Sequence, residues 1–346
     1  MRQIAIAVLF ALTITGVNAQ QPPTSGVTRL DPALDDIIAL DAKPELVKGE
    51  YFGFLEGPVW VQARGGGYLL FSDVAANNIY KWIPDGKLSV FLENSGYTGT
   101  EPLAAGGQSF NGRLHIVVFG SNGVTLDPQG RVVFTTHGNR TIERLEKDGT
   151  RTLLADRYDG KRLNSPNDLV VKSDGAIYFT DPPGGLRGDK DPRKELPYSG
   201  VFMVKGGRVQ VLVDDRAGRP NGLAFTPDEK FLYVNGLRKI MKYEVQPDGT
   251  IANGQLFADM TADPLPGNTD GMKVDQRGNV YCTGAGGVWI MSPSGKHLGT
   301  IRLPETPSNL AFGDADGRTV YFTARQGLYR VRVKVPGVRP GAPPVS

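Results

Sequence analysis

Six short segments of the chain share one pattern, in which a carboxylate or amide residue precedes an apolar strand, a glycine-containing turn and a second strand. The segments begin at Glu56, Asn122, Asn167, Asn221, Asp270 and Asn309. Successive starting residues are 66, 45, 54, 49 and 39 positions apart, close to the roughly 40–50-residue period of propeller blades. The repeat therefore predicts an all-β fold, a six-bladed β-propeller.

The outer half of each repeat supports this count and indicates how the ring closes. Five copies continue into a further hairpin whose turn is Asp-Gly, Gly-Gly or Ser-Gly, as tight hairpin turns require. The sixth copy ends with the strand 328–335 and leaves one unpaired edge, for which the segment 45–52 is the free partner. We therefore predict one propeller domain at 45–335, closed by an N-terminal strand that completes the last blade and followed by a proline-rich tail at 336–346.

Composition agrees with many short strands joined by turns, since the chain contains 45 glycines and 25 prolines. Hydrophobic residues make up 40% of the sequence, which is enough for a core. The formal net charge is only +3, and Lys and Arg are scattered without a basic stripe. No nucleic-acid partner is expected.

The N-terminus has the organisation of a cleaved secretory signal. Two residues, Met1 and Arg2, precede an apolar run that extends to Val17 and ends in Val-Asn-Ala before a polar segment. We predict a signal peptide at 1–19, an N-terminal extension at 20–44 and a periplasmic or secreted protein with no membrane association after cleavage. The alternative is a membrane anchor, but the run is shorter than the ~20 residues that span a bilayer.

The phase of the repeat gives the six starting residues a shared position. Residues that lead the innermost strands of a propeller converge at one mouth of the central tunnel, so their side chains become neighbours. Two are carboxylates and four are amides, with no Lys, Arg or His among them, and two negative charges in a narrow tunnel need a counter-charge. Oxygen ligands in a wide, flexible site favour Ca²⁺ over Mg²⁺, whereas zinc would require His or Cys. The ring therefore predicts a metal site for Ca²⁺, with another divalent cation as the alternative.

Each starting residue also has a purely structural interpretation. Asn-Gly and Asp-Gly pairs often form turns, and Asn or Asp before a strand can bind backbone groups. Six occurrences in one phase, with carboxylates at only two, favour metal binding by most of the set. Asn309 is left out of the predicted metal shell, because the Gly or Asp that follows the other five residues is missing there.

With these motifs, the chain resembles the family of regucalcin (senescence marker protein) and gluconolactonase, six-bladed propellers that hydrolyse sugar lactones with a divalent metal. The segment from His137 to Pro183, HGNRTIERLEKDGTRTLLADRYDGKRLNSPNDLVVKSDGAIYFTDPP, is similar to the bacterial gluconolactonase branch. The resemblance implies a metal held by the Glu of the EGP motif and by the Asn-Asp, Asn-Gly and Asp-Gly-Met motifs, here Glu56, Asn167, Asn221 and Asp270. It also implies that Asp270 donates or accepts the proton.

Two positions differ from the animal members of that family. Those members carry a substrate-binding Arg two residues before the Asn of the Asn-Asp motif, where this chain has Ser165. Asn122 belongs to the bacterial pattern and has no counterpart in regucalcin. We predict that Asn122 binds substrate or supports the metal ligands.

Lactone hydrolysis needs a polarised carbonyl, an activated water and a stabilised oxyanion. A Ca²⁺ ion at the tunnel mouth can supply the first and third, but it acidifies bound water far less than Zn²⁺ does, so a base is needed. Asp270 is the predicted base. His137 is the alternative base, and Asp181 is a predicted substrate-binding residue, because each follows the second strand of its blade and so lies near the same rim.

Covalent catalysis has no support in the sequence. No Gly-x-Ser-x-Gly motif is present, and the lone cysteine, Cys282, lies within a predicted strand, where we expect a small core residue. Water is the expected nucleophile. Two long insertions, 94–119 and 183–200, interrupt the blade rhythm and are candidate lids that would determine substrate specificity.

Three functions fit these residues. The first is hydrolysis of D-glucono-1,5-lactone or a related aldonolactone to the aldonic acid by a gluconolactonase-type enzyme. The second is another Ca²⁺-dependent propeller hydrolase, such as a phosphotriesterase or a paraoxonase-like esterase, and the third is a non-catalytic binding module that the ion only stabilises. The segment 137–183 favours the first over the second, and the two carboxylates favour an enzyme over the third. We expect a small-molecule sugar lactone as the partner of a monomer or weak dimer.

Overall fold

The structure is a computed structural model that describes residues 25–214 and 218–344. The predicted signal peptide at 1–19 lies outside the described residues, as do the first residues of the predicted extension. Within these two ranges, no helix is both long enough and apolar enough to cross a membrane.

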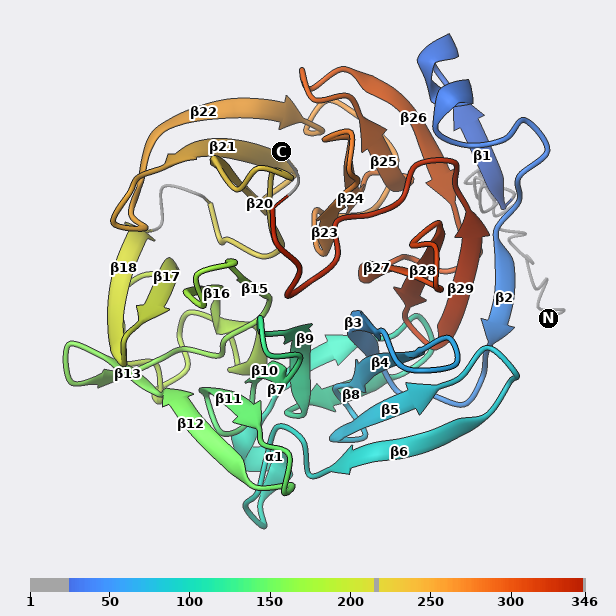
Figure 1. The fold of residues 1–346 in the computed structure, drawn as a ribbon. Coiled ribbons are helices and arrows are strands. Elements are labelled where there is room, and N and C mark those ends of the chain that lie inside the picture. The colour runs from blue at the N-terminus through green and yellow to red at the C-terminus, as the bar shows by residue number, and fades with distance from the viewer. Residues whose placement is uncertain (1–24, 215–217, 345–346) are drawn as a thin grey trace, which may run out of the picture.

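Six antiparallel sheets surround a central axis, and each runs from an innermost strand outward (Figure 1). The first blade consists of β3 (Leu55–Val61), β4 (Tyr68–Asp73), β5 (Asn78–Trp82) and β6 (Leu88–Glu93), and the second consists of β9 (Ser121–Leu126), β10 (Val132–Thr136), β11 (Thr141–Leu145) and β12 (Arg151–Ala155). The third blade consists of β15 (Leu169–Val171), β16 (Ile177–Asp181), β17 (Gly200–Lys205) and β18 (Arg208–Asp214), and the fourth consists of β19 (Leu223–Phe225), β20 (Phe231–Gly236), β21 (Lys239–Val245) and β22 (Ile251–Asp259). The fifth blade contains β23 (Met272–Val274), β24 (Val280–Gly284), β25 (Gly287–Met291) and β26 (His297–Arg302), and the sixth contains β27 (Asn309–Gly313), β28 (Thr319–Ala324) and β29 (Gly327–Arg332). The predicted six-bladed propeller is confirmed.

The sixth blade is completed by the N-terminal segment, as predicted. Strand β2 (Glu45–Lys48) pairs antiparallel with β29, so the two ends of the propeller are joined in one sheet. A second N-terminal strand, β1 (Gly26–Arg29), pairs with β26 and makes the fifth blade five-stranded. A short 3₁₀ turn, η1 (Pro32–Asp36), connects β1 to β2. Figure 1 shows β1 and β2 one after the other along the outer edge of the ring, beside β26 and β29 respectively.

Apolar side chains form six clusters, one between each pair of neighbouring blades. The cluster between the third and fourth blades includes the fully buried Tyr178 and Leu232. The cluster between the sixth and first blades contains Trp60 and Tyr321, whose rings stack with their centroids 5.8 Å apart. Cys282 is fully buried in the cluster between the fourth and fifth blades. Because the core is divided among the blade interfaces, the innermost strands are left to line the central tunnel.

The C-terminal segment 336–344 covers one end of this tunnel, at the last residues of the innermost strands. Val338 N donates to Val274 O over 3.0 Å, and Gln276 N donates to Pro336 O over 2.9 Å. In Figure 1 this segment, in red, crosses the middle of the ring. Between it and the innermost strands lies a cavity of about 90 Å³. The opposite end of the tunnel is therefore the one that carries the first residues of the innermost strands.

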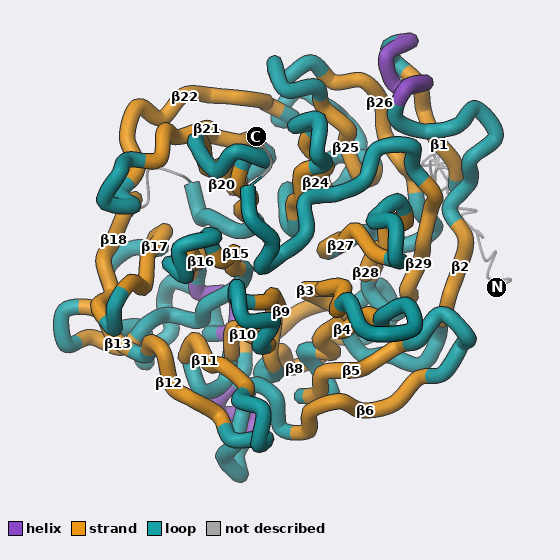
Figure 2. The backbone as a smooth tube through the Cα atoms, viewed as in Figure 1, coloured by secondary structure: helices purple, strands orange, loops and turns teal. Residues whose placement is uncertain are grey.

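Both predicted insertions have some structure of their own. The first contains the helical turn α1 (Pro102–Ala105) and the hairpin of β7 (Gly107–Phe110) and β8 (His115–Val118). The second contains the 3₁₀ turn η2 (Pro183–Gly185). A further hairpin, β13 (Arg157–Tyr158) and β14 (Lys161–Arg162), follows the second blade. Figure 2 shows that strands and loops make up nearly all of the fold.

Candidate active site

Strand register shows which residues lie at the same level of the tunnel. In four blades, the same backbone N–H of the innermost strand donates to a side chain on the second strand. The pairs are Gly123 N to Thr135 Oγ1 (2.8 Å), Asp168 N to Thr180 Oγ1 (3.2 Å), Gly222 N to Asn235 Oδ1 (3.1 Å) and Asn309 N to Thr323 Oγ1 (3.1 Å). Asn309 is therefore level with Asp168, one residue further along the strand than Asn167.

The prediction that Asn309 begins the sixth repeat was wrong by one residue. Ser308 occupies that place, and Asn309 occupies the place of the glycine or aspartate that follows. The lead ring therefore consists of Glu56, Asn122, Asn167, Asn221, Asp270 and Ser308, and the second ring consists of Gly57, Gly123, Asp168, Gly222, Gly271 and Asn309. The alignment of the repeats placed Asn309 with the asparagines of the other blades, because the sixth repeat has no glycine that would mark the position after the lead residue.

Neighbouring blades hold the backbone of the lead ring. Thr135 Oγ1 donates to the carbonyl of Asn167 and Thr180 Oγ1 donates to that of Asn221, each over 2.6 Å. In the same way, Asn235 Nδ2 donates to the carbonyl of Asp270 over 2.6 Å. In these three blades, a polar residue near the end of the second strand thus fixes the lead residue of the next blade, whereas the equivalent Thr283 Oγ1 of the fifth blade has no partner among the described residues.

The second ring is too crowded for six side chains. A Cβ on Gly57, whose φ of 44° already favours glycine, would lie 2.0 Å from the carbonyl oxygen of Asn122. A Cβ on Gly271 would lie 2.1 Å from Cγ of Asn309. Glycine at four of the six positions therefore leaves room for the side chains of Asp168 and Asn309.

Several lead-ring oxygens have no hydrogen-bond partner in the described part of the chain. Oδ1 of Asn122, Oδ1 of Asn221 and Oδ1 of Asp270 are each buried and unpaired. A buried acceptor without a partner costs roughly 1–3 kcal/mol, so three in one ring are unexpected unless a ligand satisfies them. This set of orphaned oxygens fits a hard cation.

The lead ring and Asp168 of the second ring bring carboxylates together. Burial raises the pKa of Glu56 to about 7, and the nearby Asp168 carboxylate adds to this effect. Burial, together with the charges of Glu56 and Asp168, raises the pKa of Asp270 well above its usual range, and Arg325 opposes that rise. Three carboxylates are therefore held close enough to repel one another, and a bound cation would relieve that repulsion.

A metal fits the lead ring, although the ring contains only two carboxylates and no His or Cys. Over residues 25–214 and 218–344, no three His, Cys, Asp or Glu side chains gather as a metal-binding group. Two carboxylates and three amides supply oxygens instead, as Ca²⁺ sites permit. The lead residues predicted as metal ligands, Glu56, Asn167, Asn221 and Asp270, all lie in this ring, and their role as ligands stays a prediction.

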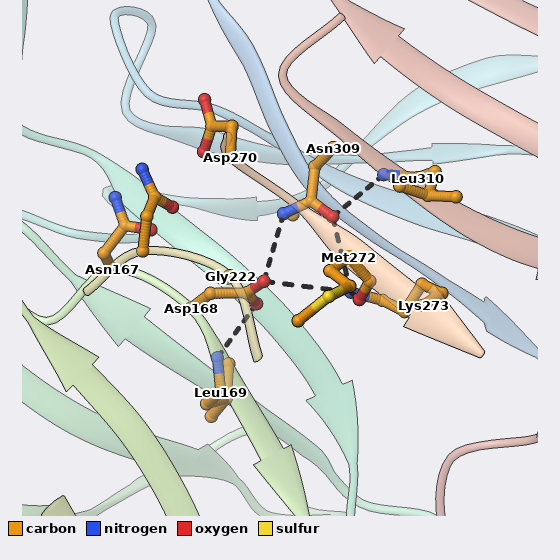
Figure 3. A network of polar contacts seen from close by, with 12 residues as sticks. Asn167, Asp168, Leu169, Gly222, Asp270, Met272, Lys273, Asn309 and Leu310 are labelled. Carbon is orange, nitrogen blue, oxygen red and sulfur yellow. Dashed lines mark hydrogen bonds and ion pairs between the residues drawn. The ribbon is translucent and has the colours of Figure 1, made fainter. Parts of the chain in front are cut away.

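A polar network beneath the lead ring was missed by the sequence analysis. Asn309 Nδ2 donates to Glu56 Oε2 over 3.3 Å and lies 3.4 Å from Asp168 Oδ2, while Lys273 Nζ lies 3.8 Å from the same Asp168 oxygen. Figure 3 shows dashed lines that join Asp168, Lys273 and Asn309 to one another, with Asn167 and Asp270 nearby. The available signal was a lysine in an innermost strand, which is an expensive position for an unpaired charge.

His137 and Asn122, which were both predicted as site residues, contact each other at the rim. Asn122 Nδ2 lies 3.2 Å from His137 Nε2, a hydrogen bond when the imidazole carries its proton on Nδ1. That Nδ1 is buried and has no partner in the described residues. Burial lowers the pKa of His137 to about 4, so the ring is neutral at pH 7. A neutral imidazole can accept or relay a proton but carries no charge to attract an anion.

Asp181 has a different environment from His137. Its Oδ2 accepts from Asn164 N over 2.7 Å and its Oδ1 accepts from Ser165 N over 2.8 Å. The residue is completely buried, and burial raises its pKa to about 7. These contacts indicate that Asp181 positions the segment that leads to Asn167, while its predicted contact with substrate stays untested.

The second insertion rests on the rim of the site. Ser165, where the animal family members carry Arg, donates from Oγ to Pro182 O over 2.7 Å and accepts from Gly185 N over 2.8 Å. A Cβ on Gly185 would lie 2.5 Å from Cγ of His137. The turn η2 therefore packs directly against the predicted catalytic histidine.

The first insertion bridges from the third blade to the sixth. Arg187 Nη2 donates to Leu103 O over 2.8 Å, and Arg193 Nη1 donates to Ala105 O over 2.8 Å. At its other end, Arg325 Nη1 donates to Phe110 O over 2.7 Å. The insertion thus joins the loops above the third and sixth blades on the same face as the lead ring.

The covered and open sides of the site follow from these contacts. Glu56 and Asn122 are each 3% exposed, and Asn167 is 9% exposed, whereas Asn221 and Asp270 are partly exposed. The insertions lie over the first three blades and the sixth. The ring is therefore most exposed on the side of the fourth and fifth blades, at Asn221 and Asp270.

Comparisons with known proteins agree with this geometry. The family model described as SMP-30/Gluconolactonase/LRE-like region matches residues 54–326. The chain belongs to this family. A gluconolactonase from Zymomonas mobilis subsp. mobilis is 37% identical over 344 residues, which cover 94% of this chain and 92% of that protein. The match extends over all six blades, so the resemblance inferred from the motifs is confirmed.

Solved structures of this SMP-30/gluconolactonase family share the fold. A gluconolactonase from Xanthomonas campestris superposes with a TM-score of 0.74 at 32% identity, covering 90% of this chain and 96% of that one. Another gluconolactonase-family structure gives a TM-score of 0.76 at 31% identity, covering 91% of this chain and all of the other. A calcium-binding regucalcin from Agrobacterium tumefaciens is 16% identical with a TM-score of 0.65, which shows the common fold alone.

Proposed function

We propose that the protein is a lactonase that hydrolyses a sugar lactone, D-glucono-1,5-lactone or a related aldonolactone, to the aldonic acid with the help of a divalent metal. The observation that carries this proposal is the lead ring, in which Oδ1 of Asn122, Asn221 and Asp270 is buried without a partner. The substrate class rests on the gluconolactonases of Zymomonas mobilis and Xanthomonas campestris to which the chain is similar.

Glu56, Asn167, Asn221 and Asp270 are the residues that would hold the metal, with Ca²⁺ the expected ion. When bound, such a cation supplies polarisation of the lactone carbonyl and neutralisation of the developing oxyanion. The chain's own residues must then orient the substrate and handle the protons.

Asp270 is the proposed base that takes the proton from the attacking water. It lies on the open side of the ring, where it is partly exposed, and its Oδ1 has no partner in the described residues. His137 is neutral at pH 7 and lies behind Asn122. The pair Asn122 and His137 would hold a substrate hydroxyl through Asn122 Oδ1, and the packing of η2 on His137 would keep bulk water from that side.

The test is proton release from D-glucono-1,5-lactone by the purified protein, corrected for spontaneous ring opening. We expect turnover that is lost in EDTA and restored by Ca²⁺. No turnover of any aldonolactone by the Ca²⁺-loaded protein would overturn the proposal.

Two variants assign the base. With saturating Ca²⁺, Asp270→Asn should lower kcat by at least about 100-fold, as general bases contribute roughly 10²–10⁴. His137→Gln should lower kcat less and leave the Ca²⁺ dissociation constant within about twofold, because the side-chain partner of His137 is Asn122, which is not among the proposed ligands. Full activity of Asp270→Asn together with an inactive His137→Gln would transfer the role to His137.

We also propose that the protein is exported, as the apolar N-terminal segment indicates. Mass spectrometry of protein from cell fractions should find a chain beginning at Gln20 outside the cytoplasm. An intact Met1 in the cytoplasmic fraction would contradict this.

A further inference from the structure

Three oxygens surround the ammonium group of Lys273 inside the tunnel. Nζ lies 3.0 Å from Met272 O, 3.3 Å from Asn309 Oδ1 and 3.8 Å from Asp168 Oδ2. The side chain is 20% exposed, and that of Asp168 is 3% exposed. Figure 3 shows the two side chains of the second ring and the lysine gathered at one point.

Lys273 is exceptional at its level of the tunnel. Strand register places it with five residues that pair with equivalent positions of the second strands; this third ring consists of Val59, Thr125, Val170, Ala224, Lys273 and Ala311. All six line the cavity of about 90 Å³ that the C-terminal segment covers. The other five carry no charge, and Glu229, which also lines the cavity, is paired with Lys172 over 3.3 Å. A charge in such surroundings is expensive unless it is paired, and Asp168 in the ring above supplies the partner.

The oxygens around Nζ are also suitable ligands for a metal ion. A carboxylate, a side-chain amide oxygen and a backbone carbonyl are the donor types found in Ca²⁺ sites. In this chain the lysine supplies the positive charge that those oxygens require. Asn309 is held by the same contacts, since its Oδ1 faces Lys273 while its Nδ2 donates to Glu56 of the lead ring.

We propose that the ammonium of Lys273 occupies a cation site of the tunnel, built from Asp168, Asn309 and the Met272 carbonyl, and thereby excludes a metal ion from that position. The lysine is a fixed counter-charge that holds Asp168 and Asn309 in place beneath Glu56. The number of Ca²⁺ ions bound by the unaltered protein rests on the proposed function, which places one metal ion in the lead ring. The exclusion of a second ion by Lys273 does not, because it involves residues of the second and third rings.

The test is the number of Ca²⁺ ions bound per chain, measured by calorimetry and by elemental analysis after equilibrium dialysis. Lys273→Met should bind one more ion per chain than the unaltered protein. The added ion should disappear in Lys273→Met/Asp168→Asn, which lacks the carboxylate. Lys87→Met, at a side chain that is 79% exposed in an outer hairpin, should not change the count.

Lys273→Thr provides a second variant that the fold can accommodate, because Thr125 stands at the equivalent place of the second blade. It should also gain one ion. An unchanged Ca²⁺ count in folded Lys273→Met and Lys273→Thr would overturn the inference. If the unaltered protein binds no Ca²⁺, the proposed metal site of the lead ring fails, and a gain from zero to one ion in the variants would still support the role of Lys273.

Discussion

Replacing Glu56 with glutamine should stabilise the metal-free protein while abolishing its response to metal. Glu56 is 3% exposed, and its Oε2 accepts from Gly57 N over 3.0 Å and from Asn309 Nδ2 over 3.3 Å. The amide oxygen of glutamine can accept both hydrogen bonds. Glu56→Gln therefore removes a buried charge and little else.

The magnitude follows from the pKa of Glu56, which burial raises from 4.5 to about 7. The folded protein keeps the proton to a higher pH than the unfolded chain, so stability is lost as the pH rises from about 4.5 through about 7. At about 1.4 kcal/mol per pKa unit, the cost of Glu56 to the free energy of unfolding is about 3 kcal/mol at pH 8 and under about 1 kcal/mol at pH 5. Glutamine does not titrate and escapes this cost.

Urea unfolding in EDTA, followed by tryptophan fluorescence, measures the difference. We expect Glu56→Gln to be more stable than the unaltered protein by about 3 kcal/mol at pH 8, with the difference shrinking to under about 1 kcal/mol at pH 5. Added Ca²⁺ should stabilise the unaltered protein and not the variant. The control is Glu101→Gln, an exposed side chain in the first insertion, for which no more than about 0.5 kcal/mol is expected. A variant that is less stable than the unaltered protein at pH 8 in EDTA, or a difference that does not depend on pH, would refute the reasoning.

Two further predictions concern the same two rings. A metal that binds Glu56 must compete with its proton. Calorimetry should therefore show the Ca²⁺ affinity rising by up to about tenfold per pH unit between pH 6 and about 7, and the contribution of Glu56 should level off above about pH 7. An affinity that is independent of pH would contradict the assignment of Glu56 as a ligand. Gly271→Ala should lower the free energy of unfolding by about 1–3 kcal/mol, because its Cβ would lie 2.1 Å from Cγ of Asn309, whereas Gly184→Ala, where a Cβ meets nothing within 4 Å, is the matched control for thermal denaturation. Equal stabilities for the two alanine variants would show that the second ring is not crowded.

There is a physical reason why the contact between Asp168 and Lys273 could not be predicted from the sequence. Both residues are next to or near predicted ligands in the sequence, yet their partners lie across the tunnel. Asp168 and Asn309 are separated by 141 residues and meet only when the ring closes. The bridge from Arg325 to Phe110 spans 215 residues. No local sequence pattern indicates which residues so far apart will meet. Neither the polar network below the lead ring nor the position of the first insertion over the site could therefore be predicted from the repeat.

The sequence by itself determined the number of blades, the closing strand and five of the six residues of the lead ring. The blades and the lead residues depend on turns, strand alternation and a repeat period, which are encoded within about 50 neighbouring residues, and the closing strand follows from counting the one unpaired edge that the sixth repeat leaves. Only the tertiary structure decided that Ser308 and not Asn309 completes the lead ring, because one residue of register is invisible where the marker glycine is absent. It also decided that β1 joins the fifth blade, that the C-terminal segment covers one end of the tunnel, and that Lys273 faces Asp168. Each of these depends on which surfaces meet after the six blades have packed around one axis.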